Sequence, residues 1–151
     1  MKQAIIILFC IGLLLSCKTQ KDYNNKGIAF LTLEKTSCKG QCPIFSLAIF
    51  EDGNVTYTGI KNVDRIGKYR KTISRSSVRD LKKTFVNSDF FSFDNEYTSK
   101  ITDLPTTYIS FTDKGQTKRI RDYSGAPQKI KDLEKVIEKI IESTVGWEKV
   151  E

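Results

Sequence analysis

The sequence predicts an α+β domain in which an antiparallel sheet of about five to six strands is covered on one face by two helices. Three observations lead to this fold class. Short segments rich in β-branched and aromatic residues are separated by turn residues. Two longer segments repeat apolar residues every three or four positions, as amphipathic helices do. The elements follow in the order of four strands, a helix, two strands and a helix, which is typical of two packed layers.

Residues 1–16 precede this domain and have the pattern of an export signal. Lys2 is followed by an unbroken apolar run over residues 4–15, which is short for a membrane span but suits a signal peptide. The run ends in Leu14-Leu15-Ser16-Cys17, which resembles the lipobox of bacterial lipoproteins. We therefore interpret residues 1–16 as a lipoprotein signal peptide that is cleaved before Cys17. An ordinary signal peptide or a buried N-terminal helix is the alternative.

The lipobox resemblance implies that Cys17 is lipidated, with acyl chains such as palmitate that anchor the protein in a membrane. Residues 17–26 are polar and lack apolar periodicity, so we expect a flexible tether there and a single domain over residues 27–151. No acidic run follows Cys17 in the sequence. We therefore expect a cell-envelope protein of the outer membrane that faces the periplasm.

Four strands are predicted in the first half of the domain, over residues 28–35, 44–51, 54–60 and 66–73. The second strand is almost continuously apolar, which indicates a central position. Asp52-Gly53 is a hairpin signal, because glycine tolerates the positive φ of tight turns. In the third strand Val55, Tyr57 and Gly59 alternate with threonines and are predicted to share one face.

The first helix and the last two strands follow. Ser74 has the position of an N-cap, and the helix after it is predicted to reach about residue 86 with Val78, Leu81 and Phe85 on one face. A phenylalanine-rich segment at residues 90–93 is expected to pack under the sheet, and residues 94–104 are predicted to form a polar loop. Strands over residues 106–112 and 117–123 are joined by a turn at residues 113–116.

The last helix begins at Pro127, which suits a first helical turn. Its apolar stripe is predicted to face the sheet and comprises Ile130, Leu133, Ile137, Ile140, Thr144 and Trp147. The opposite face is predicted to carry Lys131, Glu134, Lys135, Glu138, Lys139 and Glu142. A coiled coil is the competing interpretation, although the stripe is short for one.

The composition narrows the chemistry that the chain can perform. The sequence contains no histidine, which excludes histidine-dependent triads and removes the commonest zinc ligand. We expect no metal and no cofactor. The formal net charge of +7 is moderately basic, and the expected envelope location argues against a nucleic-acid partner.

Cys38 and Cys42 form the one cysteine pair expected in the mature protein, because Cys10 leaves with the signal peptide and Cys17 is lipidated. An envelope location permits a disulfide between them. Closing this loop of five residues would stabilise the fold by about 2 kcal/mol. The alternative is thiol–disulfide exchange. Redox motifs of the thioredoxin type place their cysteines at a helix N-terminus, whereas Cys42 leads into a predicted strand.

Residues 38–45 read Cys-Lys-Gly-Gln-Cys-Pro-Ile-Phe, a C-x-G-x-C-P motif followed by an apolar and an aromatic residue. This motif resembles the signature of an uncharacterised domain-of-unknown-function family that occurs largely in lipoproteins of Bacteroidota-type bacteria. Weaker similarities occur at residues 52–59, 102–107 and 123–127 and at Trp147. The resemblance covers about residues 27–147 and implies an envelope of two membranes, but it brings no activity, ligand or catalytic residue.

A basic stretch over residues 61–83 contains nine Lys and Arg but only Asp64 and Asp80 as acids. Contact with an anionic envelope component or a protein partner is one interpretation, and a solvated surface is the other. The candidate contact residues are Lys68, Arg70, Lys71, Arg75, Arg79, Lys82 and Lys83.

Two further sets of side chains have a structural and a functional interpretation. The aromatic residues on predicted strands indicate core packing or a ligand-binding sheet face; they are Tyr57, Tyr69, Tyr108, Phe111 and Tyr123. A small acidic set matches no EF-hand spacing, so loop solvation is favoured over calcium binding; it comprises Asp89, Asp94, Glu96 and Asp103.

The sequence therefore predicts a lipid-anchored envelope protein that acts as a non-enzymatic binding or scaffolding module. The main alternative is a redox lipoprotein that uses Cys38 and Cys42. A weaker alternative is a hydrolase with a Ser–Lys or carboxylate-pair site, although the serines, Ser76 and Ser77 among them, lie in no recognisable catalytic motif.

Overall fold

The structure, a computed structural model, describes residues 27–101, 103–143 and 145–150. The expected signal peptide, Cys17 and the tether lie outside these residues. The elements in chain order are β1 (Leu31–Lys35), β2 (Ile44–Ile49), β3 (Asn54–Lys61), β4 (Gly67–Thr72), α2 (Arg75–Asn87), η1 (Phe90–Ser92), β5 (Glu96–Tyr97), β6 (Thr107–Asp113), β7 (Gln116–Asp122), α3 (Gln128–Glu142) and β8 (Glu148–Lys149). None of the helices in these ranges combines the length and the apolar character that crossing a membrane requires.

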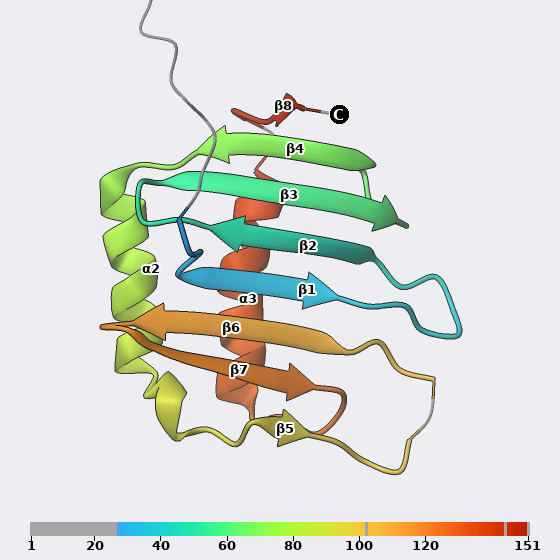
Figure 1. Ribbon diagram of the computed structural model, residues 1–151. Helices are drawn as coiled ribbons and strands as arrows, with labels where there is room; N and C mark the ends of the chain where they lie inside the picture. The colour runs from blue at the N-terminus through green and yellow to red at the C-terminus, as the bar shows by residue number, and fades with distance from the viewer. Residues whose placement is uncertain (1–26, 102, 144, 151) are drawn as a thin grey trace, which may run out of the picture.

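The strands form one open sheet in the order β5-β7-β6-β1-β2-β3-β4-β8. The first strand of the domain lies in the middle, where it pairs antiparallel with β2 on one side and with β6 on the other. Figure 1 shows α2 and α3 on the same face of the sheet, both running across the strands. The predicted two-layer α+β architecture is therefore confirmed.

The sheet is larger than predicted, with eight strands in place of five to six. The two additional strands, β5 and β8, contain two residues each and are too short to show an alternating pattern. β5 lies within residues 94–104, which were predicted to be a loop. β5 also pairs parallel with β7, so the sheet is not purely antiparallel as predicted.

The pairing register gives the sheet a covered face and an open face. Leu31 of β1 lies between Ile49 of β2 and Phe111 of β6, and all three side chains are fully buried beneath the helices. The alternate positions point to the other face, which no helix of the described residues covers. That open face carries hydroxyl-bearing residues and exposed ion pairs such as Arg119–Glu34 and Arg70–Glu148.

α2 begins as the sequence predicts. The Ser74 hydroxyl accepts a hydrogen bond from the Ser77 backbone N–H at 3.1 Å, which caps the first turn. Val78, Leu81 and Phe85 are buried against the sheet, as their spacing predicts. The phenylalanines that follow are packed as expected, and Phe90 lies 5.8 Å from the buried ring of Phe111.

α3 differs from its prediction in two respects. It ends at Glu142, so Trp147 does not continue the helical stripe, and Thr144 lies outside the described residues. Glu134, which was predicted on the solvent face, is only 5% exposed. Glu134 follows Ile130 by four positions and precedes Ile137 by three, and this spacing places it on the buried side.

The connection between β3 and β4 folds back over the covered face, and Gly59 permits this. A Cβ atom on Gly59 would lie 1.8 Å from the Arg65 carbonyl oxygen and 2.9 Å from the Val63 side chain. Asn62 adopts a left-handed conformation with φ of 55°, which helps the chain to reverse its direction. The loop at residues 62–65 therefore rests directly on the backbone of β3.

Gly59→Ala is expected to displace this loop, because the new methyl group would collide with backbone atoms that cannot rotate away. We expect the free energy of unfolding to fall by about 1–3 kcal/mol, as for other overpacked sites, when it is measured by urea denaturation. Gly40→Ala is the matched control, because a Cβ there would meet only the Cys38 sulfur at 3.7 Å. Equal effects of the two substitutions would contradict the close approach at Gly59.

Candidate functional site

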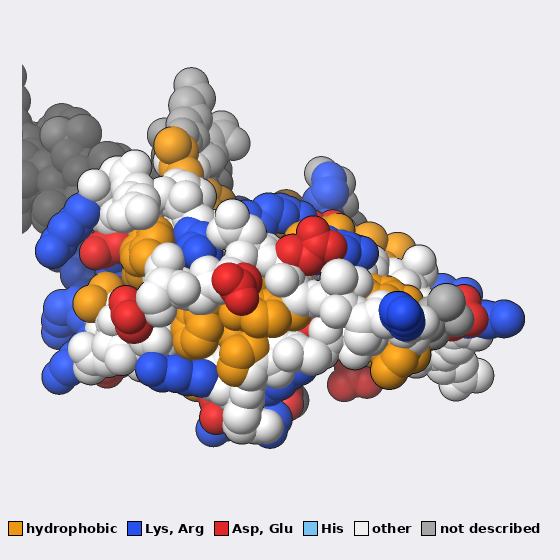
Figure 2. All heavy atoms as spheres, turned by 90° about the horizontal axis from the view of Figure 1, so that it is seen from below, with side chains coloured by type: hydrophobic (Ala, Val, Ile, Leu, Met, Phe, Trp, Pro, Cys, Tyr) orange, Lys and Arg blue, Asp and Glu red, His pale blue; other side chains and the backbone are white. Residues whose placement is uncertain are grey.

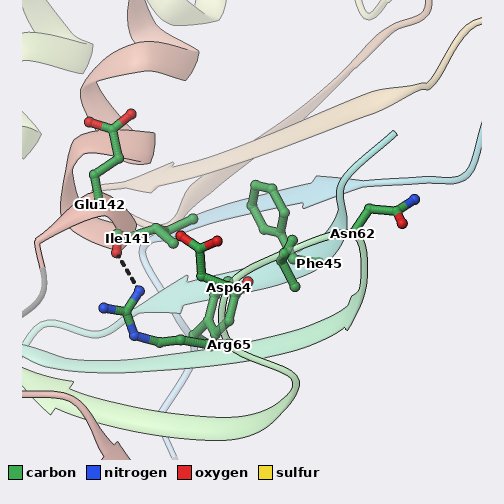
Figure 3. Close-up of a pocket in the computed structure, with 8 residues that line it drawn as sticks. Phe45, Asn62, Asp64, Arg65, Ile141 and Glu142 are labelled. Carbon is green, nitrogen blue, oxygen red and sulfur yellow. Dashed lines mark hydrogen bonds between the residues drawn. The ribbon is translucent and has the colours of Figure 1, made fainter. Parts of the chain in front are cut away.

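A hollow of about 250 Å³ lies between the loop at residues 62–65 and the last turn of α3. Phe45, Tyr57, Asn62, Val63, Asp64, Arg65, Ile141 and Glu142 line it. In Figure 3 the Asp64 carboxylate points toward the space between Ile141 and Phe45, whereas Glu142 points away from that space. The hollow therefore has an apolar floor and one carboxylate directed over it.

The floor belongs to an aromatic cluster that begins at Phe45 and ends at Trp147. The ring centroids of Phe45 and Tyr57 are 5.7 Å apart, and those of Tyr57 and Trp147 are also 5.7 Å apart. Tyr69 continues the cluster along β4 at 6.4 Å from Tyr57. The rings pack in tilted pairs, so the floor of the hollow is a continuous aromatic surface.

Two cations next to this cluster bind the C-terminal end of α3. The Arg65 guanidinium donates to the Ile141 carbonyl at 3.2 Å, and the Lys71 ammonium donates to the Ile140 carbonyl. Carbonyl groups in a last helical turn lack helical partners and carry partial negative charge, so both contacts are favourable. The two cations also lie over the Trp147 ring, with Lys71 4.6 Å from its centroid. Arg65 and Lys71 therefore both bind the C-terminal end of α3.

Burial and neighbouring charges shift the pKa values of two side chains at this site. Burial raises the pKa of Tyr57, Arg65 opposes that rise, and Asp64 adds to it. Burial lowers the pKa of Lys71, and the nearby charge of Arg65 lowers it further. Within the described residues Asp64 and Glu142 form no ion pair. The hollow therefore has the Asp64 carboxylate, unpaired among the described residues, and the Arg65 guanidinium, bound to the helix end, beside an aromatic floor.

The Cys38–Cys42 loop adjoins this site. The two cysteines are joined by a disulfide, with their Cα atoms 5.9 Å apart. The Asn62 side chain donates to the Cys42 carbonyl at 3.0 Å, which links the disulfide loop to the loop that forms the hollow. On the other side the Lys39 backbone N–H donates to the Asp103 carbonyl at 3.4 Å. The disulfide loop is thus held between two other loops at one end of the sheet.

The structure separates the seven basic residues that the sequence grouped together. Lys68 and Arg70 lie on the open face of β4, and Arg70 pairs with Glu148 at 3.1 Å. Lys71 points to the covered face and is only 8% exposed. The other four, Arg75, Arg79, Lys82 and Lys83, belong to α2.

The strand aromatics and the acidic set are also divided. Tyr57, Tyr69 and Phe111 face the helices, whereas Tyr108 lies on the open face beneath Arg119 at 4.2 Å. The Tyr123 hydroxyl accepts a hydrogen bond from the Leu104 backbone N–H at 3.3 Å. The acidic residues also lie apart from one another: Asp89 precedes η1, Asp94 follows it, Glu96 pairs with Arg121 and Asp103 contacts Lys39.

A buried acidic pair is a polar feature that was not predicted from the sequence. Asp122 of β7 and Glu134 of α3 are 1% and 5% exposed, and Lys131 pairs with both. Burial raises the pKa of Glu134 to about 7, Lys131 opposes this, and the neighbouring Asp122 charge adds to it. The spacing of Glu134 from Ile130 and Ile137 was a sequence signal for its burial.

Three serines lie at the start of α2. The Ser74 hydroxyl lies 2.7 Å from that of Ser76 and 2.9 Å from that of Ser77, so these residues serve the N-terminal turn of α2. No group of three or more His, Cys, Asp or Glu side chains in the described ranges could hold a metal ion. We take the hollow beside residues 62–65 and the disulfide loop as the candidate sites.

Comparison with known proteins finds a matching family model, but this match carries no described activity. Residues 29–141 match the model of DUF6438, described as a domain of unknown function. No curated protein matches the chain. The match contains the disulfide loop and the loop of the hollow, whereas Trp147 lies beyond its end.

Glu134→Gln should make the protein more stable at pH 8 and leave it nearly unchanged at pH 4. Because the folded pKa is raised to about 7, the folded state retains a proton that the unfolded chain releases from about pH 4.5 upward. The free energy of unfolding of the unmodified protein therefore falls as the pH rises from about 4.5 to 7. The Gln variant lacks this fall, which is of the order of 1–3 kcal/mol. Thermal melts followed by circular dichroism test this, with the exposed Glu142→Gln as the control. A gain that does not depend on pH would contradict it.

Proposed function

The chain belongs to the DUF6438 family, a domain of unknown function, and we propose that it is a lipid-anchored cell-envelope protein with a non-enzymatic binding role. The lipobox-like Leu14-Leu15-Ser16-Cys17 supports the anchor, with acylated Cys17 followed by a polar tether. The lack of acidic residues directly after Cys17 supports the periplasmic face of an outer membrane. A protein partner in the envelope fits this location.

The hollow beside α3 carries the proposal of a binding role. Its floor is formed by the rings of Phe45 and Tyr57, and the Asp64 carboxylate is directed over it (Figure 3). Aromatic faces and a carboxylate both attract cations, and together they bind ammonium and guanidinium groups. Arg65 lines the same hollow, but its guanidinium is bound to the Ile141 carbonyl, and Asp64 forms no ion pair among the described residues. We therefore infer that the hollow takes a Lys or Arg side chain of a partner.

Several observations favour binding over catalysis. The chain contains no histidine, and the Ser74, Ser76 and Ser77 hydroxyls are engaged with one another. The carboxylate pair Asp122 and Glu134 is buried beneath α3, where a substrate could not reach it. The hollow instead offers shape and charge without a nucleophile activated by a base.

Thiol–disulfide exchange by Cys38 and Cys42 is the second candidate function. One observation favours it: the Gly40 backbone N–H donates to the Cys38 sulfur at 3.2 Å, a contact that would stabilise a thiolate. Against it, neither cysteine belongs to a helix, and the disulfide loop is bound to residues 62 and 103. A structural disulfide is therefore the preferred role.

Binding of a cation in the hollow can be followed through Trp147, the single tryptophan of the chain, whose ring contacts Tyr57. We expect n-butylammonium to change the tryptophan fluorescence in a saturable way, and n-butanol at the same concentrations to have little effect. Asp64→Asn should weaken n-butylammonium binding by up to about fivefold, the contribution of one exposed ion pair. Asp113→Asn, in the β6–β7 hairpin, is the control. Equal responses to the charged and the neutral probe would contradict the proposal.

Reduction of the Cys38–Cys42 disulfide should lower the melting temperature, and the pair should have a reduction potential below about −300 mV, as structural disulfides do. Closing a loop of five residues contributes about 2 kcal/mol, and the loop also orders Asn62 and Asp103. Equilibration in thiol buffers and melts of both redox forms provide the measurement. A potential of about −120 to −230 mV with unchanged melting would instead assign thiol–disulfide exchange to the pair.

A further inference from the structure

The side chains of α2 separate into three sides of the helix. Val78, Leu81 and Phe85 are buried against the sheet. The side toward α3 lines a hollow of about 420 Å³ with Ser77, Asp80 and Thr84. The remaining, outer side carries Arg75, Arg79, Lys82 and Lys83. All but one of the basic residues of α2 are fully solvated, and the exception is the partly covered Lys82.

This outer side of α2 lies next to the place where the chain enters the domain. The Lys82 ammonium lies 5.4 Å from the centroid of the Phe30 ring and pairs with Glu51 at 2.6 Å. Phe30 is bound to the end of β2 through its N–H to the Ile49 carbonyl at 3.0 Å. Figure 1 shows α2 and the start of β1 at the same end of the sheet. Lys82 thus connects the basic side of α2 to the N-terminal end of the domain.

The outer side of α2 carries four basic residues and no acidic one, because Asp80 lies on the side toward α3. Glu51 is paired with Lys82, and the Asp52 carboxylate accepts bonds from Asn54. Among the described residues no ion pair involves Arg75, Arg79 or Lys83. In Figure 2, Lys and Arg side chains stand at the left-hand end of the molecule, the end at which α2 lies in Figure 1. Exposed apolar residues accompany them, with Ile28 83% and Val86 50% exposed.

The length of the tether restricts how far this end can move from a membrane. Residues 17–26 can span at most about 35 Å when fully extended, and a flexible chain of that length is on average much shorter. The end of the domain that contains residue 27 is therefore the end nearest to an acylated Cys17. The same tether would also bring the basic side of α2 close to the lipid headgroups.

We propose that the outer side of α2 rests on the anionic headgroups of the membrane that anchors the protein. The surface comprises Arg75, Arg79, Lys82, Lys83 and Val86. The proposal rests on the lipid anchor of the proposed function, and it orients the domain so that the disulfide loop and the hollow point away from the membrane. Its occupant is an anionic lipid surface, to which basic side chains within a Debye length are attracted.

The test uses the full acylated protein in phosphatidylglycerol vesicles and in phosphatidylcholine vesicles. Amine acetylation followed by mass spectrometry reports the exposure of Lys83 on α2 and of Lys61 at the far end of β3. We expect Lys83 to react about fivefold more slowly in the anionic vesicles than in the neutral ones, with Lys61 unchanged. Added salt should restore the reactivity of Lys83.

Paired charge reversals identify the surface. Arg75→Glu with Arg79→Glu should abolish the protection of Lys83, whereas Lys129→Glu with Lys135→Glu, the same change of charge on α3, should preserve it. All four positions are exposed, so the variants are expected to fold. Loss of protection in both variants would overturn the proposal, because it would show a response to net charge alone.

Other outcomes separate this proposal from the anchor itself. In one outcome the protein is acylated at Cys17 and sediments with both kinds of vesicle. If Lys83 is then equally reactive in both, the result overturns the proposed orientation but is consistent with the anchor. Protection in both vesicles that grows with protein density would assign α2 to contact between copies and overturn the membrane contact. Absence of the acyl groups would overturn the anchor and the orientation together.

Discussion

The pairing of β1 with β6 is the interaction on which the rest of this fold depends. β2, β3 and β4 follow β1 directly and could form a sheet by themselves, but β6 and β7 come after α2 in the chain. Five residues of β1 pair with β6 over separations of 72 to 80 residues, and this ladder joins the two parts into one sheet. Leu33 and Ile109 face each other in it, both fully buried. The helices then have a continuous surface to cover, and α3 can cross from β7 to β4.

The C-terminal end of α3 packs against β4 and the loop that precedes it. Arg65 and Lys71, from the loop before β4 and from β4 itself, bind the carbonyl groups of the last helical turn. Trp147 returns after the helix and covers both cations. The disulfide loop also contacts two other loops at its end of the sheet. Lys39 contacts Asp103, and Asn62 binds Cys42.

Most of the elements could be predicted from the sequence, because their signals are local. Ser74 caps α2, the apolar stripe of Ile130, Leu133 and Ile137 faces the sheet, and the hairpin at Asp52-Gly53 forms where expected. β5 and β8 could not be predicted, because two residues are too few to show an alternating pattern. Both strands form only through pairing with β7 and β4.

The candidate site was less predictable than the fold. The hollow depends on Gly59, which was predicted only as a residue of a strand face, although its missing side chain is what lets residues 62–65 fold over the sheet. Lys71 was grouped with solvated cations because its neighbours in sequence are charged, and strand alternation turns it to the covered face. The buried position of Glu134 was indicated by its spacing, but its charge led to the opposite assignment.

The two outer strands of the sheet would have a consequence if the protein is confined to a membrane surface, as we propose. A membrane concentrates its tethered proteins in two dimensions, where a long unpaired edge would recruit the backbone of a neighbour and start a growing fibre. Here each border ends in a two-residue strand, and three of these four positions are charged: Glu96, Glu148 and Lys149. β8 covers only Tyr69 and Arg70 of β4, and β5 covers only Arg121 and Asp122 of β7, so the charged side chains are what discourages such recruitment along the rest of each edge. The fold is thus suited to crowding, since its sheet can stay wide without becoming a template for polymerisation.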